Sequence, residues 1–195
     1  MATIQLIVEG HGDAKALPVL VRRILHEKFQ KHTVGIQTFK QPRGQLVKQD
    51  GLERAINTVK KRSCDAILVL IDADDSCPME EPFPSLVSHG KKVAGNIAFF
   101  LVLANREYEA WFLASLDMLK GRNGINRLAT FTGDPELIRD AKGKISGYMP
   151  RNAPYSETLH QEKLSAIIDI DLAHRRSRSF RKLYGDLQEI STLCK

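Results

Sequence analysis

Residues 67–75 read ILVLIDADD, five consecutive apolar residues that run directly into a cluster of aspartates. An apolar run of this length is typical of a strand buried on both faces, as in the middle of a parallel sheet covered by helices. Asp72 and Asp74 lie two residues apart at the end of that strand, so their carboxylates share a small volume and repel each other. Because a hard dication such as Mg²⁺ relieves that repulsion, we expect a cation site there.

A second acidic cluster follows the first apolar run of the chain. Residues 4–8 read IQLIV and lead into residues 9–13, EGHGD, where the glycines let backbone and ligand approach closely. Glu9 comes directly after the expected strand and is interpreted as a metal ligand or catalytic group. Asp13 is explained equally well as a ligand and as the N-cap of the helix that follows.

Apolar periodicity predicts alternating strands and helices along the first half of the chain. We expect strands over 3–8, 34–39, 65–71 and 96–103, separated by helices over 14–31, 51–62 and 85–93. This order implies an α/β fold with a mostly parallel central sheet and right-handed crossovers. Ligands of such sheets bind at the carboxyl ends of the strands, which is where both acidic clusters fall.

The second half of the chain is predicted to be mainly helical. Helices are expected over 107–120, 157–170 and 179–193, whereas the intervening stretch 121–154 is rich in glycine and proline. A chain of 195 residues suffices for one ordinary domain with a small appendage. We therefore expect a catalytic α/β domain at residues 1–120 and a mostly helical C-terminal extension at 121–195, packed on the same domain.

A third acidic pair, Glu107 and Glu109, follows the fourth expected strand. Both residues are also explained as first-turn acids that offset a helix dipole. If the three acidic sets meet at one sheet edge, they can hold one or two Mg²⁺ or Mn²⁺ ions, which polarise a phosphoryl oxygen and activate water. No serine or cysteine stands in an obvious nucleophile elbow, so water is the expected nucleophile.

The net charge of +6 means that basic residues must gather away from these acids, which favours a polyanionic partner such as nucleic acid. The candidates for phosphate contacts lie near the expected site and in a basic run over 174–182. They are Lys40, Arg43, Arg106, Arg175, Arg176, Arg178, Arg181 and Lys182. The basic run is explained equally well as a solvated face.

Cysteine usage and hydropathy favour a cytoplasmic protein. Cys64, Cys77 and Cys194 have scattered spacings that form neither a disulfide framework nor a zinc pattern. The longest apolar runs are strand-sized, and the first residues do not read as a signal segment. We therefore expect neither secretion nor a membrane partner.

The pattern Glu9-Gly10-x-x-Asp13 after the first strand, with Asp72-x-Asp74 after a later one, resembles the Toprim fold. That fold is shared by topoisomerases, bacterial primases, small ribonucleases and the OLD-family nucleases, and the likeness covers roughly the first half of the chain. Most of the chain resembles a bacterial Toprim-like family of unknown function, often encoded beside AAA- or ABC-type ATPases. The residues that carry this closer likeness are Val8-Glu9-Gly10 to Leu17-Pro18, Glu107-x-Glu109-Ala110-Trp111 and Arg178-Ser179-Phe180-Arg181.

The resemblance implies roles for the acidic residues. Glu9 would serve as metal ligand or general acid/base, and Asp72 and Asp74 would hold Mg²⁺. By likeness to the OLD nucleases, Glu109 together with Glu107 would complete a second metal position.

The resemblance also implies a basic side chain that steadies the transition state, for which Arg106, Lys163 and Arg181 are equal candidates. No tyrosine is placed for a topoisomerase, and no zinc-binding module of a primase is present. A Mg²⁺-dependent nuclease remains as the leading expectation, as the effector of an ATPase-coupled defence against phage. Whether DNA or RNA is cut, and whether the chain forms a homo-oligomer, is left open.

Two alternatives are kept. Residues 72–76, DADDS, also fit the opening motif of haloacid-dehalogenase phosphatases, with Asp72 as nucleophile and Asp74 as general acid. Against this, a complete strand-helix-strand-helix precedes the motif, and Glu9 would have no role. The other alternative is a non-catalytic module that binds metal or nucleotide and regulates a partner ATPase.

Overall fold

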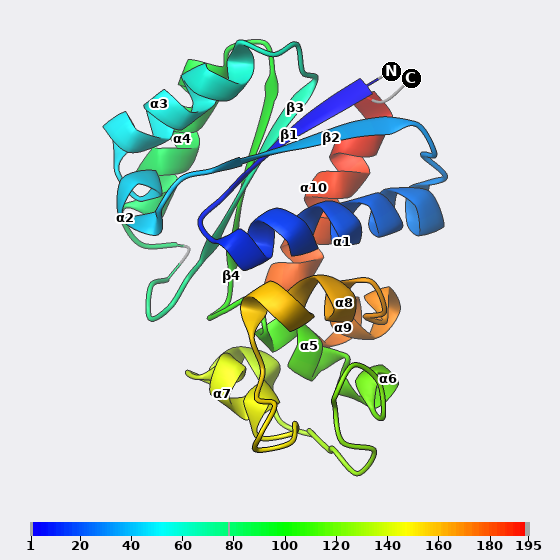
Figure 1. The fold of residues 1–195 in the computed structure, drawn as a ribbon. Helices are drawn as coiled ribbons and strands as arrows, with labels where there is room; N and C mark the ends of the chain where they lie inside the picture. The colour runs from blue at the N-terminus through cyan, green and yellow to red at the C-terminus, as the bar shows by residue number, and fades with distance from the viewer. Residues whose placement is uncertain (1, 78, 194–195) are drawn as a thin grey trace.

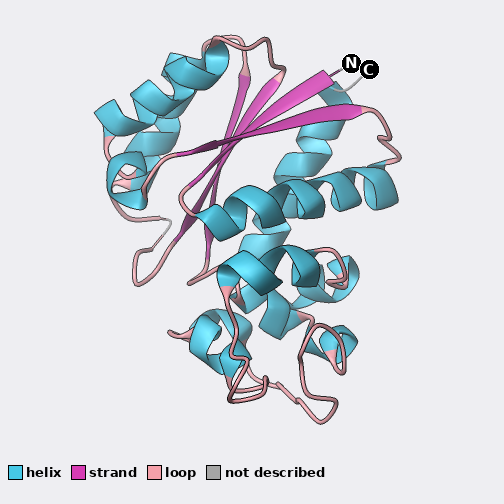
Figure 2. Ribbon diagram, in the orientation of Figure 1, coloured by secondary structure: helices cyan, strands magenta, loops and turns pink. Residues whose placement is uncertain are grey.

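In the described part of the chain, residues 2–77 and 79–193 of the computed structural model, four strands form one parallel sheet (Figure 2). Their order across the sheet is β2-β1-β3-β4, with β1 at Ala2–Val8, β2 at Val34–Lys40, β3 at Ala66–Asp72 and β4 at Ala98–Ala104. The expected parallel α/β sheet is therefore confirmed. The strand that contains the apolar run 67–71, β3, lies in the interior of the sheet between β1 and β4.

Helices cover both faces of the sheet (Figure 1). α3 (Gln49–Lys60) and α4 (Phe83–Ala94) lie on one face, and α1 (His11–Phe29) and α10 (Arg178–Leu193) lie on the other. Successive strand residues point to opposite faces, so Leu6 joins the hydrophobic cluster beneath α1 and α10 while Ile7 joins the one beneath α3 and α4. This double burial explains why the strands are continuous apolar runs.

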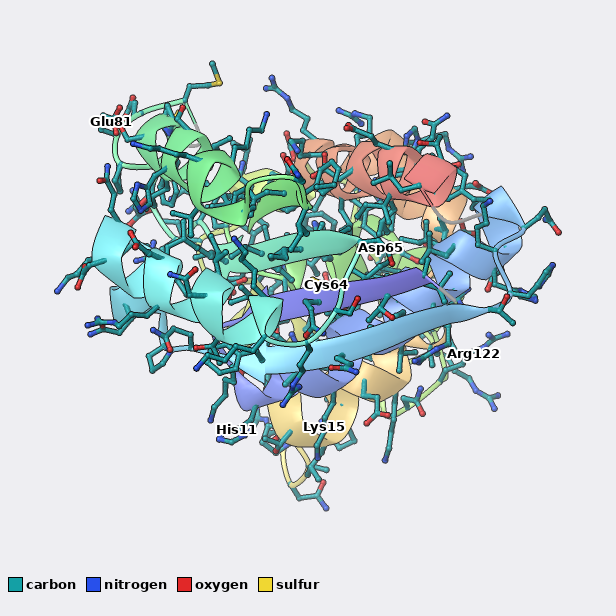
Figure 3. All side chains as sticks on the ribbon, turned by 90° about the horizontal axis from the view of Figure 1, so that it is seen from above. His11, Lys15, Cys64, Asp65, Glu81 and Arg122 are labelled. Atoms are coloured by element: carbon teal, nitrogen blue, oxygen red, sulfur yellow. The ribbon has the colours of Figure 1, made fainter. Side chains whose placement is uncertain are left out.

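A group of short helices lies below the carboxyl edge of the sheet in Figure 1. They are α5 (Ala110–Ala114), α6 (Leu116–Leu119), the 3₁₀ turn η1 (Pro135–Leu137), α7 (Ala141–Ser146), the π-helix η2 (Glu157–Gln161), α8 (Glu162–Ser165) and α9 (Ile170–Arg176). Figure 3 views the molecule from above, where His11 and Lys15 lie at the start of α1 beside η2. Residues 157–161, which form η2, thus lie beside the start of α1.

The structure corrects several expected boundaries. α1 begins at His11 rather than at residue 14, because the Asp13 carboxylate accepts the Gly10 N–H at 3.1 Å and extends the helix back to Gly10. Asp13 is therefore not the N-cap. The expected loop over 41–45 contains a short helix, α2 (Arg43–Leu46), and α3 starts at Gln49 instead of at residue 51.

Two helices expected in the second half are broken into shorter pieces. The one expected over 107–120 begins at Ala110 and divides into α5 and α6 at Ser115, whose hydroxyl accepts the Asp169 N–H at 2.8 Å. The one expected over 157–170 divides into η2 and α8, and α9 follows after a turn. Tertiary hydrogen bonds, which carry no periodic signal, lie at the break at Ser115 and at the one after α8, where Arg23 donates to the carbonyls of Ser165 and Ile168.

The division at residue 120 stays a prediction, and Cys194 lies outside the described residues. None of the helices within the described residues is both long enough and apolar enough to cross a bilayer.

Candidate functional site

A cavity of about 270 Å³ opens at the carboxyl edge of the sheet. It brings together four of the acidic residues that the sequence singled out, Glu9 and Asp13 after β1 and Asp72 and Asp74 after β3. The full lining is Glu9, Gly10, Asp13, Arg43, Asp72, Asp74, Lys142, Glu157 and Gln161.

Backbone and side-chain hydrogen bonds tie the ends of three strands together at this cavity. Val8 lies opposite Leu70 in the sheet, so Glu9 comes level with the end of β3. Glu9 Oε1 accepts the backbone N–H of Asp72 at 2.5 Å, and Asp72 Oδ1 accepts the backbone N–H of Tyr108 at 2.9 Å. The carboxyl groups of Glu9 and Asp72 consequently face the same small volume.

Asp13 and Arg43 hold the loops around the cavity. Asp13 Oδ2 accepts a hydrogen bond from the Gly10 N–H, and Asp13 Oδ1 accepts one from Gln161 Nε2 at 2.8 Å. The Arg43 guanidinium donates to the carbonyl of Asp72 at 3.1 Å and lies 3.2 Å from Asp74 Oδ2. Arg43, expected as a phosphate contact, therefore also positions the loop after β3.

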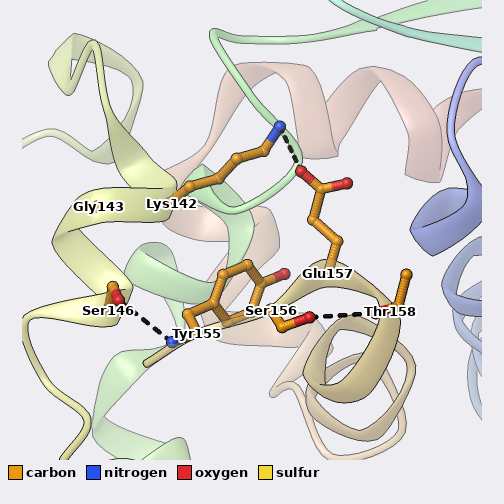
Figure 4. Close-up of a pocket in the computed structure, with 7 residues that line it drawn as sticks. All are labelled: Lys142, Gly143, Ser146, Tyr155, Ser156, Glu157 and Thr158. Carbon is orange, nitrogen blue, oxygen red and sulfur yellow. Dashed lines mark hydrogen bonds and ion pairs between the residues drawn. The ribbon is translucent and has the colours of Figure 1, made fainter. Parts of the chain in front are cut away.

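Lys142 is the second basic residue of the cavity, and the sequence analysis did not single it out. Its Nζ lies 2.8 Å from Glu157 Oε1 and 3.8 Å from Asp72 Oδ2 (Figure 4 shows the pair with Glu157). Burial opposes its charge, but the surrounding Glu109, Glu157 and Asp72 outweigh burial and raise the pKa of Lys142 above its ordinary value. Lys142 is thus cationic through the neutral pH range.

The acids of the cavity resist ionising together. Burial raises the pKa of Asp72 well above its usual range, and the charges of Glu109, Asp13 and Glu9 raise it further. Burial is also the main cause that raises the pKa of Glu9 and that of Asp13. A bound cation would relieve this repulsion, which is the physical basis for considering the cavity as a metal site.

Glu107 and Glu109 lie outside the set of described residues that line the cavity. Glu109 is fully buried behind it, where Oε1 accepts the Tyr155 hydroxyl at 2.7 Å, and burial raises the pKa of Glu109 to about 7. Glu107 Oε2 accepts the backbone N–H of Lys142 at 3.0 Å and so anchors the start of α7. The helix that forms, α5, begins at Ala110 with Glu109 as its N-cap residue. Neither Glu107 nor Glu109 is therefore a first-turn acid.

The other basic candidates are spread around the molecule. Lys40 contacts His11 at the start of α1, and Arg106 pairs with Asp75. In the basic run, Arg175 and Arg178 are exposed. The other basic candidates of the run bond within the protein. Arg176 donates to the carbonyls of Ala114, Phe131 and Gly133, Arg181 donates to those of His174 and Arg175, and Lys182 pairs with Asp186.

The basic run is not gathered around the acidic cavity. Lys182 and Asp186 line a separate cavity beside residues 97–101, at the start of β4 rather than at its carboxyl end. Of the three candidates for a transition-state cation, Lys163 is exposed on α8. None of the three is among the described residues that line the acidic cavity, whereas Lys142 is.

The cavity offers the carboxylates of Glu9 and Asp72 as donors for a divalent cation. Within the described residues, no three His, Cys, Asp or Glu side chains are grouped closely enough to hold a metal ion by themselves. Mg²⁺, however, usually keeps several waters and takes only one or two carboxylates, with substrate phosphates completing its shell. Gln161 is not counted as a donor, because its amide nitrogen donates to Asp13 and its buried Oε1 lies against Gly12 at the start of α1.

The fold and the cavity together define an α/β protein whose parallel sheet carries an acidic site at its carboxyl edge. A family described as a domain of unknown function, DUF4276, matches residues 8–188, and the chain belongs to that family. The match spans every residue that lines the cavity. No curated protein and no solved structure matches the chain.

Proposed function

We propose that this protein is a Mg²⁺- or Mn²⁺-dependent nuclease of Toprim type, which hydrolyses phosphodiester bonds of nucleic acid. The observation that carries the proposal is the shared cavity of Glu9 and Asp72, joined by the hydrogen bond from the Asp72 N–H to Glu9 Oε1. The gathering of carboxylates with raised pKa values around one cavity supports a functional site there.

In this proposal the residues of the cavity have different catalytic roles. Asp72 and Glu9 would hold the cation, which supplies Lewis-acid stabilisation of the charge on a phosphoryl oxygen. Glu9, whose pKa is raised by burial, can accept a proton from the attacking water at Oε2. The Lys142 ammonium, 3.8 Å from Asp72 Oδ2, stabilises negative charge that develops on the phosphate.

The partners of such a nuclease follow from the same resemblance. Nucleic acid is the proposed substrate, and an AAA- or ABC-type ATPase is the proposed partner in a defence system against phage. Arg43, which already lies at the cavity, is the best placed of the basic candidates to contact a phosphate.

The phosphatase alternative has weaker support. A nucleophilic Asp72 would leave Glu9 without a role, yet Glu9 is hydrogen-bonded to the backbone of Asp72. Turnover of a phosphomonoester with a trapped aspartyl-phosphate on Asp72 would favour the phosphatase. Co-purification with an ATPase and no metal-dependent turnover in the complex would favour the regulatory module.

The direct test is cleavage of plasmid DNA, single-stranded DNA and RNA with Mg²⁺ or Mn²⁺, with and without the partner ATPase. The variant is Asp72→Asn, and Asp50→Asn, an exposed aspartate on α3, is the matched control. We expect metal-dependent cleavage by wild type and control, and a loss of about a hundredfold or more in Asp72→Asn. Equal cleavage by wild type and Asp72→Asn, or none by any protein even with the ATPase, ends the proposal.

A further inference from the structure

A second cavity, of about 470 Å³, adjoins the acidic one. It lies between α7 and the start of η2, and Lys142 and Glu157 line both cavities (Figure 4). Their ion pair, with Lys142 Nζ 2.8 Å from Glu157 Oε1, therefore marks the boundary between the two. A ligand bound at the acidic cavity would extend past this pair directly into the second cavity.

The second cavity differs from the first in chemical character. Apart from the boundary pair, whose charges offset each other, its side chains are the hydroxyls of Ser146, Ser156 and Thr158 and the ring of Tyr155. It therefore offers hydrogen-bond donors and acceptors without net charge. A phosphate group would find its cation at Lys142, on the boundary, rather than inside this cavity.

Tyr155 is held at its hydroxyl and at its backbone, and its ring also lies near that of His160, with 5.8 Å between the centroids. Its hydroxyl donates to the buried Glu109 at 2.7 Å, and its backbone N–H donates to Ser146 Oγ at 3.1 Å. Figure 4 shows the ring lying between the Lys142 side chain and Ser156. A fixed aromatic surface flanked by hydroxyls is suited to a flat, polar-edged ring, because nucleic-acid bases stack on aromatic side chains whatever their sequence.

We propose that this second cavity is a nucleoside subsite, which binds the base and sugar next to the phosphate held at the acidic cavity. Its volume lies within the range of small-molecule pockets. A base can lay its face against the Tyr155 ring only when it is not stacked and paired within a duplex, so the substrate class is single-stranded nucleic acid. This inference rests on the proposed function and specifies its substrate.

The test measures binding separately from cleavage. Fluorescence anisotropy with a labelled single-stranded oligonucleotide, the matching duplex, and an abasic strand of equal length is recorded with Ca²⁺ in place of Mg²⁺, and uncleaved probe is confirmed on a gel. Thr158→Tyr fills the subsite. Leu159→Tyr, which introduces the same side chain at the next exposed position but outside the cavity lining, is the control.

We expect wild type and Leu159→Tyr to bind the single strand at least tenfold more tightly than the duplex or the abasic strand. Thr158→Tyr should lose about tenfold in affinity for the single strand, the effect of losing one stacked base. Equal affinity for the normal and abasic strands, equal affinity of Thr158→Tyr and wild type, or no binding of any probe overturns the subsite. Loss of cleavage with these binding differences intact would instead reject the nuclease and leave the subsite standing.

Discussion

Glu109 is a carboxyl group held entirely away from solvent, and its ionisation couples folding to pH. Burial raises its pKa from 4.5 to about 7, so the folded state keeps a proton that the unfolded state has already released in that interval. Because the folded state binds more protons there, the free energy of unfolding must fall as pH rises from 4.5 to about 7. Glu9, Asp13 and Asp72, whose pKa values are also raised, act in the same direction.

Glu109→Gln keeps the shape of the side chain and removes its titration. In metal-free buffer we expect the free energy of unfolding of the variant to depend less on pH than that of wild type. Above pH 7 the variant should be more stable than wild type by up to about 3 kcal/mol, at ~1.4 kcal/mol per pH unit. Denaturant unfolding between pH 4 and pH 8 measures this. Glu80→Gln, at an exposed loop position, should follow wild type. Parallel pH profiles for Glu109→Gln and wild type would contradict the prediction.

Lys142 places a positive charge where a divalent cation would approach Asp72, with 3.8 Å between Nζ and Oδ2. We expect Lys142→Met to bind Mn²⁺ about tenfold more tightly, because a like charge has been removed, and yet to lose cleavage. Isothermal titration calorimetry measures the first effect and a cleavage assay the second. Lys144→Met, on the same short helix with its Nζ 5.5 Å from the Tyr148 ring centroid, is the matched control. Weaker Mn²⁺ binding in Lys142→Met would show that the lysine helps to organise the metal site.

The short elements α7 and η2 complete a site that the strands begin. η2 packs directly on the first turn of α1, where Gly12 is buried against Gln161 and Glu157. A Cβ on Gly12 would overlap Gln161 Oε1 and lie 2.8 Å from Glu157 Cβ. The absence of a side chain at position 12 is therefore what lets η2 bring Glu157 and Gln161 to the cavity.

Gly12→Ala should destabilise the protein by about 1–3 kcal/mol, because the added methyl group forces η2 away from α1. Gly185→Ala is the contrasting substitution, since a Cβ there meets no described atom within 4 Å outside its own helix. It should stabilise α10 by about 0.5–1 kcal/mol through helix propensity. Denaturant melts compare the three proteins, and a neutral Gly12→Ala would mean that the contact with η2 is not tight in solution.

The strands were predictable from the sequence and the short helices were not. An apolar run such as residues 67–71 reports a strand buried on both faces, and the aspartates that follow it mark its carboxyl end. α7 and η2 span six and five residues, too few for an apolar period, and contacts with α1 and Glu107 fix their positions. Lys142 and Gln161 therefore reach the cavity through tertiary fit, which leaves no signal in the local sequence.

Residues from both halves of the chain share one hydrophobic cluster. Leu6 and Val102 of the sheet belong to it together with Leu187 of α10, and so does Trp111, the single tryptophan. Trp111 donates its indole N–H to Ser179 Oγ at 2.9 Å and packs edge-on against Phe180 at the start of α10. This shared packing predicts that the sheet and the C-terminal helices unfold together.

Leu187→Ala tests this cooperativity. The fully buried side chain leaves a cavity when truncated, so we expect a loss of about 2–5 kcal/mol, whereas Leu193→Ala, 43% exposed on the same helix, should cost less than about 1 kcal/mol. Far-UV circular dichroism and Trp111 fluorescence should report one coincident transition in every protein. Two separate transitions would instead indicate that the C-terminal helices form an independent folding unit.

The first strand begins and the last helix ends on the side of the molecule where the strands start. The Thr3 N–H donates to Asp65 Oδ2 at 2.7 Å, and Leu193 lines one cavity together with the same Asp65. Figure 1 shows the start of β1 and the end of α10 close together there. The acidic cavity opens at the opposite edge of the sheet. A linker attached near either of these residues would therefore anchor the protein to a sensor chip or a fused protein with the acidic cavity pointing outward into solvent.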